Sequence, residues 1–285
     1  MVKIITDSAA DFESYELINN DIVCIPMNIS FGENEYQENV NITKEEFYNL
    51  LETSNEFPKT SQPSVYEFEK MLKSFKENGD ECVIITISSS LSGTYQNAML
   101  TKNTLEYEEC YVIDSLTATA GERILVDEAV KLRKSGKSAR EIAETLEIIK
   151  GRVTLKACID TLEYLYKGGR LSKAAYTVGS MVNIKPIIEL AQDGKVELSS
   201  KALSIRQGIK SICDSFINNE PDTRYPIYIV YSHNRKNADI LAKKINELGY
   251  DIPDERIINI GATIGAHIGK NACGYIYIGQ QKQAI

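Results

Sequence analysis

The segment Cys82-Val-Ile-Ile-Thr-Ile-Ser-Ser-Ser-Leu-Ser-Gly-Thr-Tyr95 joins an apolar run to a cluster of hydroxyl side chains. Its first part, Cys82 to Ile87, is short, apolar and rich in β-branched residues, which predicts a buried strand. From Tyr95 onward, apolar residues recur at helical spacing. A buried strand that leads directly into a helix is the repeating unit of α/β folds, so this segment predicts an α/β protein.

The hydroxyl cluster, Ser88 to Thr94, lies where the predicted strand ends and the helix begins. The first N–H groups of a helix have no partner within the helix, and its N-terminus carries partial positive charge. Such a turn therefore favours an anionic group of a ligand. A simpler interpretation is that Ser92 only caps the helix, as serine often does. The motif alone leaves both interpretations open.

The rest of the chain extends the same pattern. Further runs typical of strands are Val2–Thr6, Ile22–Pro26, Tyr111–Asp114, Val153–Cys158, Ile227–Tyr231, Arg256–Ile260 and Tyr275–Ile278. Between them, pairs of a short polar residue and a glutamate three positions later predict helix N-termini: Thr43 with Glu46, Ser64 with Glu67, Ser138 with Glu141 and Asp160 with Glu163. This alternation predicts a largely parallel sheet in the first half.

The second half is built differently. The turn Asp193-Gly194 separates two β-rich segments and predicts a hairpin, which is an antiparallel feature. We therefore predict two α/β units, residues 1–155 with a parallel sheet and residues 156–285 with a mixed sheet, with an imprecise boundary.

Composition narrows the functional classes. The 285 residues are 43% hydrophobic and 25% charged, which predicts an ordered globular protein. The net charge of −8 and the absence of a basic run argue against nucleic acid as a partner. The start MVKIITDSAADF has no signal-peptide pattern, and no apolar run has the length of a membrane span.

The six cysteines are scattered without a CxxC pair, and only two histidines are present. We expect reduced thiols in the core, no metal site and a cytoplasmic protein.

Small polar residues follow several predicted strands, where α/β proteins bind ligands. These places are Thr6-Asp7-Ser8, Asp114-Ser115, the segment Lys59 to Ser64 and the Ser88–Thr94 turn. We interpret Asp7 and Asp114 as structural, because aspartate after a strand often accepts backbone N–H bonds. For Thr60 and Ser61 a capped loop and a ligand contact are both open.

Two later segments add candidates. In Asn259 to Gly269, three glycines and His267 follow a predicted strand, and we expect a loop that lets backbone approach a ligand closely. His233 lies in a loop without such glycines and is a weaker candidate. Between two short predicted helices, Leu162 to Ser172 contains Gly168-Gly169-Arg170, which predicts an exposed, mobile arginine. It is either solvated or a fork for a carboxylate or phosphate.

These segments together resemble the DegV family, the fatty-acid-binding proteins that serve bacterial fatty acid kinases. The resemblance covers nearly the whole chain in order: IITDSAAD, KTSQPS, ISSSLSGTYQNA, VIDSLTATAG, LEYLYKGGRLS and GATIGAHIG. It implies a two-domain α/β fold whose tunnel, between or across the domains, holds one long-chain fatty acid. The acyl chain would be buried and the carboxyl group would lie near the surface.

The resemblance also implies roles for single residues. Thr60 and Ser92 would bind the carboxyl group, with His267 beside them, and Ser61, Gly93 and Thr94 would support the head-group loop. Arg170 would lie near the entrance and the surface that faces the kinase. The implied protein is a lipid carrier without catalytic residues or cofactors, which presents the carboxyl group for acyl-phosphate formation. Transient contact with a membrane surface is compatible with this role.

Two other classes remain in view. Ser92, Asp114 and His267 stand in the chain order of α/β-hydrolase triads, but the Gly-x-Ser-x-Gly turn is absent, since Ser90 and Thr94 occupy the glycine positions. A phosphate-binding enzyme is a weaker alternative, because neither GxGxxG nor GxxxxGK[ST] is present.

Overall fold

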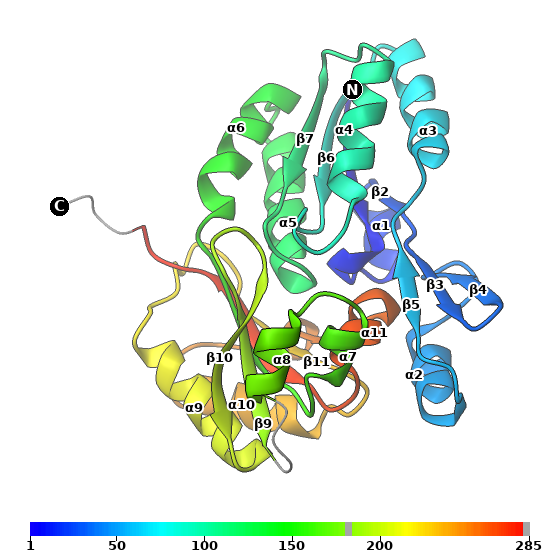
Figure 1. The fold of residues 1–285 in the computed structure, drawn as a ribbon. Coiled ribbons are helices and arrows are strands. Elements are labelled where there is room, and N and C mark those ends of the chain that lie inside the picture. Colours follow the sequence, from blue (N-terminus) through cyan, green and yellow to red (C-terminus); the bar gives the residue numbers. More distant parts are fainter. Residues whose placement is uncertain (180–183, 282–285) are drawn as a thin grey trace.

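The computed structural model describes the backbone of residues 1–179 and 184–281, and Figure 1 shows its arrangement. A four-stranded, fully parallel sheet dominates the N-terminal part, in the order β2 (Ile22–Ile25), β1 (Val2–Asp7), β6 (Glu81–Thr86) and β7 (Cys110–Asp114). Helices α3 (Val65–Glu77) and α4 (Thr94–Thr104) pack on one face, and α5 (Ala120–Lys134) and α6 (Ala139–Lys150) on the other. The sheet is buried on both faces, which explains the continuous apolar strands.

The C-terminal part contains a six-stranded mixed sheet. Its order is β10 (Val196–Ala202), β9 (Lys185–Leu190), β8 (Val153–Cys158), β13 (Cys273–Ile278), β11 (Tyr228–Tyr231) and β12 (Ile257–Asn259). Only β11 and β12 pair in parallel. Helices α9 (Ile205–Ile217) and α10 (Lys236–Asn246) cover one face, and the opposite face turns toward α5, α7 (Glu163–Lys167) and α11 (Ala262–Ile268).

A small antiparallel sheet completes the fold. Its order is β4 (Asn34–Gln37), β3 (Asn28–Phe31) and β5 (Lys59–Ser61), and helix α2 (Lys44–Thr53) packs beside it. Apolar side chains of this sheet and of α2 surround α11. The sequence did not predict these strands, because they are short and, unlike the predicted strands, largely polar (NISF, NEYQ and KTS). The remaining short elements are α1 (Ser14–Asn19), α8 (Lys173–Gly179) and the 3-10 turns Ser8–Ala10 and Asp254–Arg256.

The α/β class with a parallel first sheet and a mixed second sheet is confirmed, as is the hairpin formed by β9 and β10. Three predicted capping boxes are present, at Thr43, Ser64 and Ser138. The fourth is wrong, because the Thr161 hydroxyl rather than Asp160 accepts from the backbone N–H of Glu163. A division of the chain near residue 155 stays a prediction.

The expected loop around His267 is also wrong. Residues 262–268 form helix α11, although three glycines lie in or beside it. Burial explains this outcome: Gly265 lies against Phe47 and Tyr48, where a Cβ atom would come within 2.7 Å of the Phe47 ring. Tertiary packing therefore requires a glycine at a position that is unfavourable for a helix in isolation.

The remaining general findings concern residues 1–179 and 184–281. None of the helices there combines the length and the apolar character that crossing a membrane requires. The same residues contain no group of three or more metal-binding side chains. All six cysteines are free thiols, five buried and Cys24 partly buried.

Candidate functional site

Thr60 and His267 meet across the small sheet and α11. The Thr60 hydroxyl lies 2.8 Å from Nε2 of His267, and both side chains line a cavity of about 170 Å³. Thr60 stands in strand β5, not in the loop that the sequence predicted, and its pairing with Ile29 of β3 fixes its backbone. The contact joins residues 207 positions apart, so it depends entirely on the tertiary fold.

His267 is held as a neutral imidazole. Burial, with a smaller contribution from the Arg170 charge, lowers its pKa from 6.5 to about 4. Its Nδ1 atom is buried without a hydrogen-bond partner and faces Gly168, where a Cβ atom would approach within 2.2 Å. Gly168 is therefore required for close approach of α7 to the ring. A neutral ring can both donate and accept hydrogen bonds at the cavity wall.

Ser92 lines the same cavity from the turn before α4. Its hydroxyl lies 2.8 Å from the Thr94 hydroxyl and accepts weakly from the Thr94 backbone N–H at 3.4 Å. The N-cap of α4 is Gly93 and not Ser92, so helix capping does not fully account for the Ser92 hydroxyl. The Gly93 N–H donates to the Gln62 side chain at 3.2 Å, which ties this turn to the KTSQPS segment.

Arg170 reaches the same place from the corner between α7 and α8. The prediction that it is exposed and mobile is wrong. The guanidinium is half-buried and donates to the carbonyl oxygens of Leu91 and Gly168 at 2.8 and 2.6 Å. Burial lowers its pKa from the ordinary value. Arg170 lines the cavity, so a cation with a fixed orientation lies beside Ser92 and His267.

A second, apolar cavity adjoins the first. It holds about 60 Å³ and shares Leu91, Val196, Ile264 and Ile268 with the first cavity. Its remaining wall comes mainly from the inner face of the six-stranded sheet, including Leu155, Ala157, Ile159, Ile188 and Val230. We call the two spaces the head-group cavity and the apolar cavity. Together they form a polar entrance that leads to an apolar interior.

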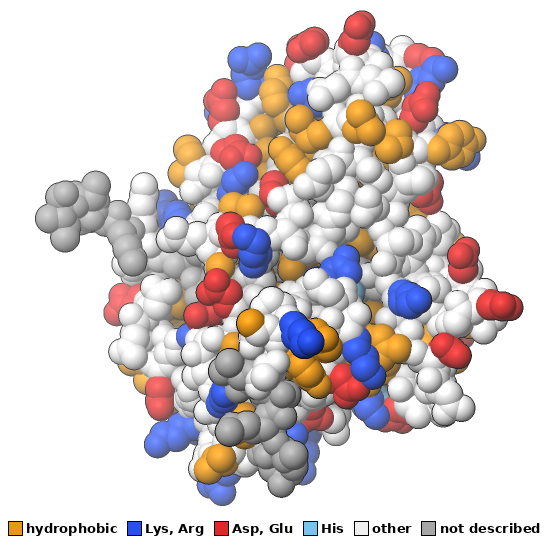
Figure 2. Space-filling view, viewed as in Figure 1, with side chains coloured by type: hydrophobic (Ala, Val, Ile, Leu, Met, Phe, Trp, Pro, Cys, Tyr) orange, Lys and Arg blue, Asp and Glu red, His pale blue; other side chains and the backbone are white. Residues whose placement is uncertain are grey.

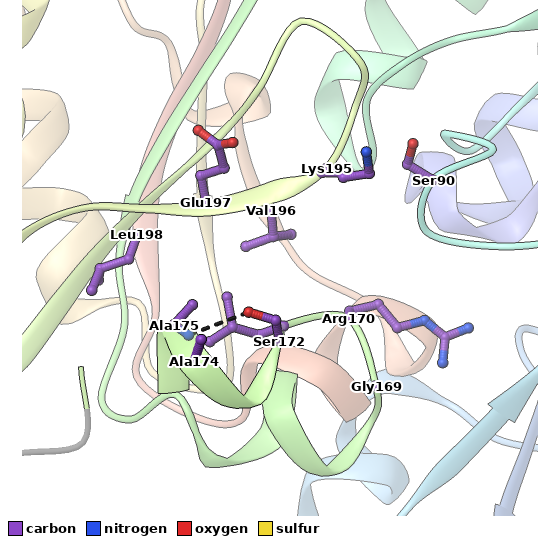
Figure 3. A pocket seen from close by; sticks show the side chains of 11 residues that line it. Ser90, Gly169, Arg170, Ser172, Ala174, Ala175, Lys195, Val196, Glu197 and Leu198 are labelled. Atoms are coloured by element: carbon purple, nitrogen blue, oxygen red, sulfur yellow. Dashed lines mark hydrogen bonds between the residues drawn. The ribbon is translucent and has the colours of Figure 1, made fainter. Parts of the chain in front are cut away.

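An open groove of about 810 Å³ lies in front of the head-group cavity, and Figure 3 shows its lining. Helix α8 forms one side of the groove and strand β10 the other. Glu197 lies on β10, and Lys195 lies in the turn before it. Arg170 and Val196 line both the groove and the head-group cavity. Arg170 therefore stands at the junction between the interior and the surface.

The hydrolase alternative does not match this geometry. Asp114 accepts from the backbone N–H groups of Ser89 and Leu116, as the structural interpretation predicted. His267 Nδ1 has no partner, so no acid orients the ring, and Nε2 pairs with Thr60 instead of Ser92. A catalytic triad needs both of these contacts. The residues stand in triad order along the chain, but the structure does not assemble them as a triad.

Comparisons with known proteins agree with this architecture. The sequence model described as "Uncharacterised protein, DegV family" matches residues 1–280. A DegV domain-containing protein of Clostridium acetobutylicum is 32% identical over 281 residues, which span 97% of this chain and 98% of the relative. The chain belongs to the DegV family.

Solved structures of this family share the fold. A fatty-acid-binding DegV family protein from Thermus thermophilus superimposes with a TM-score of 0.87 at 24% identity, covering 98% of this chain and 99% of that one. A stearic-acid-binding protein from Eubacterium ventriosum has a TM-score of 0.83 at 26% identity, covering 98% of both chains. DegV of Bacillus subtilis, described as a fatty acid binding protein, has a TM-score of 0.82 at 27% identity and covers 98% and 99%.

The supporting residues predicted for this DegV family site divide into two groups. Ser61 lines the head-group cavity beside Thr60, whereas Gly93 and Thr94 lie behind the wall that Ser92 forms. Met27, Gln62 and Thr263 are among the lining residues that sequence reasoning missed. Gln62 and Thr263 lie within the quoted motifs and could have been named, whereas nothing in the sequence marks Met27.

Proposed function

We propose that this protein binds one long-chain fatty acid, with the carboxyl group in the head-group cavity and the acyl chain in the apolar cavity, which widens from its volume of about 60 Å³ as the chain enters. The junction of the two cavities carries the proposal, because it joins hydroxyl and imidazole groups to an interior lined almost wholly by apolar side chains. Fatty acid binding by the Eubacterium and Bacillus relatives, at 26% and 27% identity, supports the same ligand class.

The energetics fit this division. Burying a methylene contributes about 0.8 kcal/mol, so roughly fourteen methylenes contribute on the order of 11 kcal/mol before the costs of association. A polar contact contributes about 1 kcal/mol net. Affinity therefore comes from the chain, whereas Thr60, Ser92 and His267 fix the position of the carboxyl group. A serine or threonine hydroxyl can both donate and accept, so it accommodates either protonation state of the acid.

We further propose that the protein is a carrier rather than an enzyme, and that it presents the carboxyl group to a fatty acid kinase in the cytoplasm for phospholipid synthesis. The groove in front of Arg170 is the route by which a second protein can reach the head-group cavity. Arg170, fixed by two carbonyl groups, would stabilise negative charge that develops there during phosphoryl transfer.

Transient contact with a membrane surface during loading belongs to the same proposal. Basic side chains gather over α7 and α8 on the face that carries the groove (Figure 2). Lys167 on α7, Lys173 on α8, Lys195 before β10 and Lys59 on β5 are all exposed. Lys167 and Lys195 form ion pairs with Glu163 and Asp193. The positive charge that this face offers to anionic lipid headgroups therefore comes mainly from Lys59, Lys173 and Arg170.

Mass spectrometry of lipid extracted from the purified protein tests the ligand directly. We expect a long-chain fatty acid at close to one molecule per chain. A protein that carries no lipid and also fails to bind palmitate or oleate after delipidation would overturn the proposal.

Phosphorylation by a cognate kinase tests the carrier role. Acyl-phosphate formation should fall strongly in the Thr60→Ala, Ser92→Ala double variant, because transfer needs the carboxyl oxygen held in line. Arg170→Ala should reduce turnover while bound lipid remains close to one per chain. Unchanged phosphorylation in the double variant would show that the carboxyl group lies elsewhere.

A further inference from the structure

One buried glutamate connects the two walls of the head-group cavity. Glu38 follows strand β4, and only 2% of its surface is exposed. Its Oε2 atom accepts from the Ser8 hydroxyl at 2.8 Å and from the Thr263 hydroxyl. Its Oε1 atom accepts from the Thr263 backbone N–H at 3.2 Å. Three donors from two distant segments therefore converge on one carboxyl group.

The first connection leads to His267. Thr263 lies in the first turn of α11, and His267 follows four residues later on the same face of the helix. Both line the head-group cavity. The preceding Gly261 N–H donates to Asp11 at 2.8 Å, and a Cβ atom at this glycine would lie 2.1 Å from Oε1 of Glu38. The start of α11 is thus held against two buried carboxyl groups.

The second connection leads to Ser92. The Ser8 hydroxyl that donates to Glu38 also accepts from the Met27 backbone N–H at 3.0 Å. The Met27 sulfur lies 3.6 Å from the Thr94 hydroxyl, which in turn pairs with Ser92. Met27 itself lines the head-group cavity. A continuous chain of contacts therefore runs from Glu38 to the opposite wall.

We propose that Glu38 is a positioning residue of the head-group site, which fixes helix α11, and through it His267, relative to the Ser92 wall. The proposal rests on the fatty-acid-binding function proposed above and assigns a residue that lies outside the cavity itself. Glu38 acts through Thr263 and does not touch the ligand.

A glutamate suits this position because both of its oxygens face donors. An ionised carboxyl group only accepts hydrogen bonds, so the Thr263 N–H and the two hydroxyls are satisfied together. A glutamine has the same shape but carries an NH₂ group in place of one oxygen, so at least one contact must rearrange. Asp7 and Glu122 hold other segments, since Asp7 accepts from the Ala9 and Ile87 N–H groups and Glu122 accepts from Thr6. Asp11 also holds the start of α11, but through the Gly261 backbone and not through a residue that lines the cavity.

The chain offers a clean measurement because it contains only two histidines, His233 and His267. In unliganded protein, NMR of the imidazole groups of Glu38→Gln should show altered His267 resonances and a titration midpoint moved upward by about one unit, because α11 is less firmly buried. The His233 resonances should change much less, because His233 reaches α11 only indirectly, through its ring contact with Tyr48. Affinity for palmitate should fall about five- to tenfold.

Glu81→Gln is the matched control. Glu81 accepts from the backbone N–H of Ala139 at 2.8 Å, so it also holds the first turn of a helix, α6, but α6 does not line the cavity. Glu81 accepts one hydrogen bond where Glu38 accepts three, so this variant should lose less stability, and it should leave His267 and palmitate affinity unchanged. An equal disturbance of His267 in Glu81→Gln would show that general destabilisation, and not Glu38, moves the ring.

Thr263→Val provides a second variant that keeps the shape of the side chain and removes one contact to Glu38. It should move the His267 resonances in the same direction by a smaller amount. If Glu38→Gln unfolds, a His267 spectrum unchanged in Thr263→Val overturns the proposal, as does an unchanged spectrum in folded Glu38→Gln. If the wild-type protein binds no fatty acid but the His267 resonances still change in Glu38→Gln, the proposed function is wrong and the positioning role of Glu38 stands.

Discussion

The head-group cavity and the apolar cavity adjoin, but different kinds of side-chain interaction define them. The first, of about 170 Å³, depends on individual polar contacts, such as the 2.8 Å contact between Thr60 and His267. The second, of about 60 Å³, is lined mainly by apolar side chains, and Thr119 and Glu189 are the polar residues of its wall. Shape and volume define the apolar cavity, whereas hydrogen-bond geometry defines the head-group cavity.

This difference predicts unequal sensitivity to substitution. Hydrophobic burial sums over many atoms, so a side chain that fills part of the apolar cavity excludes several methylenes at once. A polar contact contributes about 1 kcal/mol net, because water competes for the same groups. We therefore expect the largest losses of affinity from the apolar cavity and the largest losses of orientation from the head-group cavity.

Ala157→Leu tests the apolar side and should have the largest effect. Ala157 lies on β8 and lines the apolar cavity. Three added carbons would exclude about three methylenes, which corresponds to roughly 2.4 kcal/mol and on the order of a 50-fold loss of palmitate affinity. Titration calorimetry with palmitate and with octanoate would measure this, and octanoate should lose less.

The control for this prediction is Ala143→Leu on α6. Ala143 is equally buried but belongs to the core cluster of the parallel sheet, away from both cavities. It should destabilise the fold by the roughly 1–3 kcal/mol typical of overpacking without changing affinity. Equal losses of affinity in both variants would mean that the apolar cavity does not hold the chain.

Thr60→Val tests the polar side, with an intermediate effect. It keeps the shape of the side chain and removes the hydroxyl that pairs with His267. Palmitate affinity should fall about fivefold, which is the loss of one net hydrogen bond. Thr145→Val on α6 removes a hydroxyl that bonds only its own helix, and it should leave affinity unchanged. A 50-fold loss in Thr60→Val would show that the head group, and not the chain, dominates binding.

The smallest predicted effect is the pH dependence of the stability that His267 contributes. Because burial lowers the pKa of His267 from 6.5 to about 4, the unfolded chain binds this proton more readily than the folded protein between these values. The stability that the neutral ring contributes is therefore present above about pH 6.5 and is lost as pH falls toward 4. The ring stays neutral from pH 6 to 8, so it should not change ligand affinity there.

Urea unfolding of the wild type and of His267→Gln between pH 4.5 and 7.5 would measure the contribution of His267 as the difference between their free energies of unfolding. Asp7 and Asp11 act in the opposite direction, since burial raises their pKa values from 3.8 to about 7 and their contribution is lost as pH rises. Their contribution is common to both proteins and cancels in the difference. A difference that does not depend on pH would contradict the assigned protonation of His267, and His233→Gln serves as the control.

Some features of the fold depend only on residues that lie close together in the sequence, and these could be predicted. The strands β1, β6 and β8 were predictable because their runs are rich in apolar and β-branched residues, which favour strands. The capping boxes at Thr43, Ser64 and Ser138 were predictable because donor and acceptor lie three residues apart. The hydroxyl turn before α4 was predictable in place, but its neighbours left both capping and ligand binding open for Ser92, and only the family resemblance implied a contact with the carboxyl group.

Other features were decided by packing. The glycine-containing helix α11 forms because Phe47 and Tyr48 lie directly against Gly265, which local propensity cannot reveal. Arg170 follows two glycines and was expected in solvent, yet the carbonyl groups of Leu91 and Gly168 hold it half-buried. A local pattern indicates where a chain turns, but it does not show what covers the turn.

By itself, the sequence determined the α/β class, the positions of the main strands along the chain and the segments that carry the polar residues, because these depend on periodicity and on contacts within a few residues. Tertiary structure alone decided that Thr60 pairs with His267, that Arg170 is held at the cavity by the Leu91 carbonyl group and that Glu38 accepts from Thr263. Such contacts join residues far apart in the chain, and their geometry exists only after the sheets and α11 have packed together.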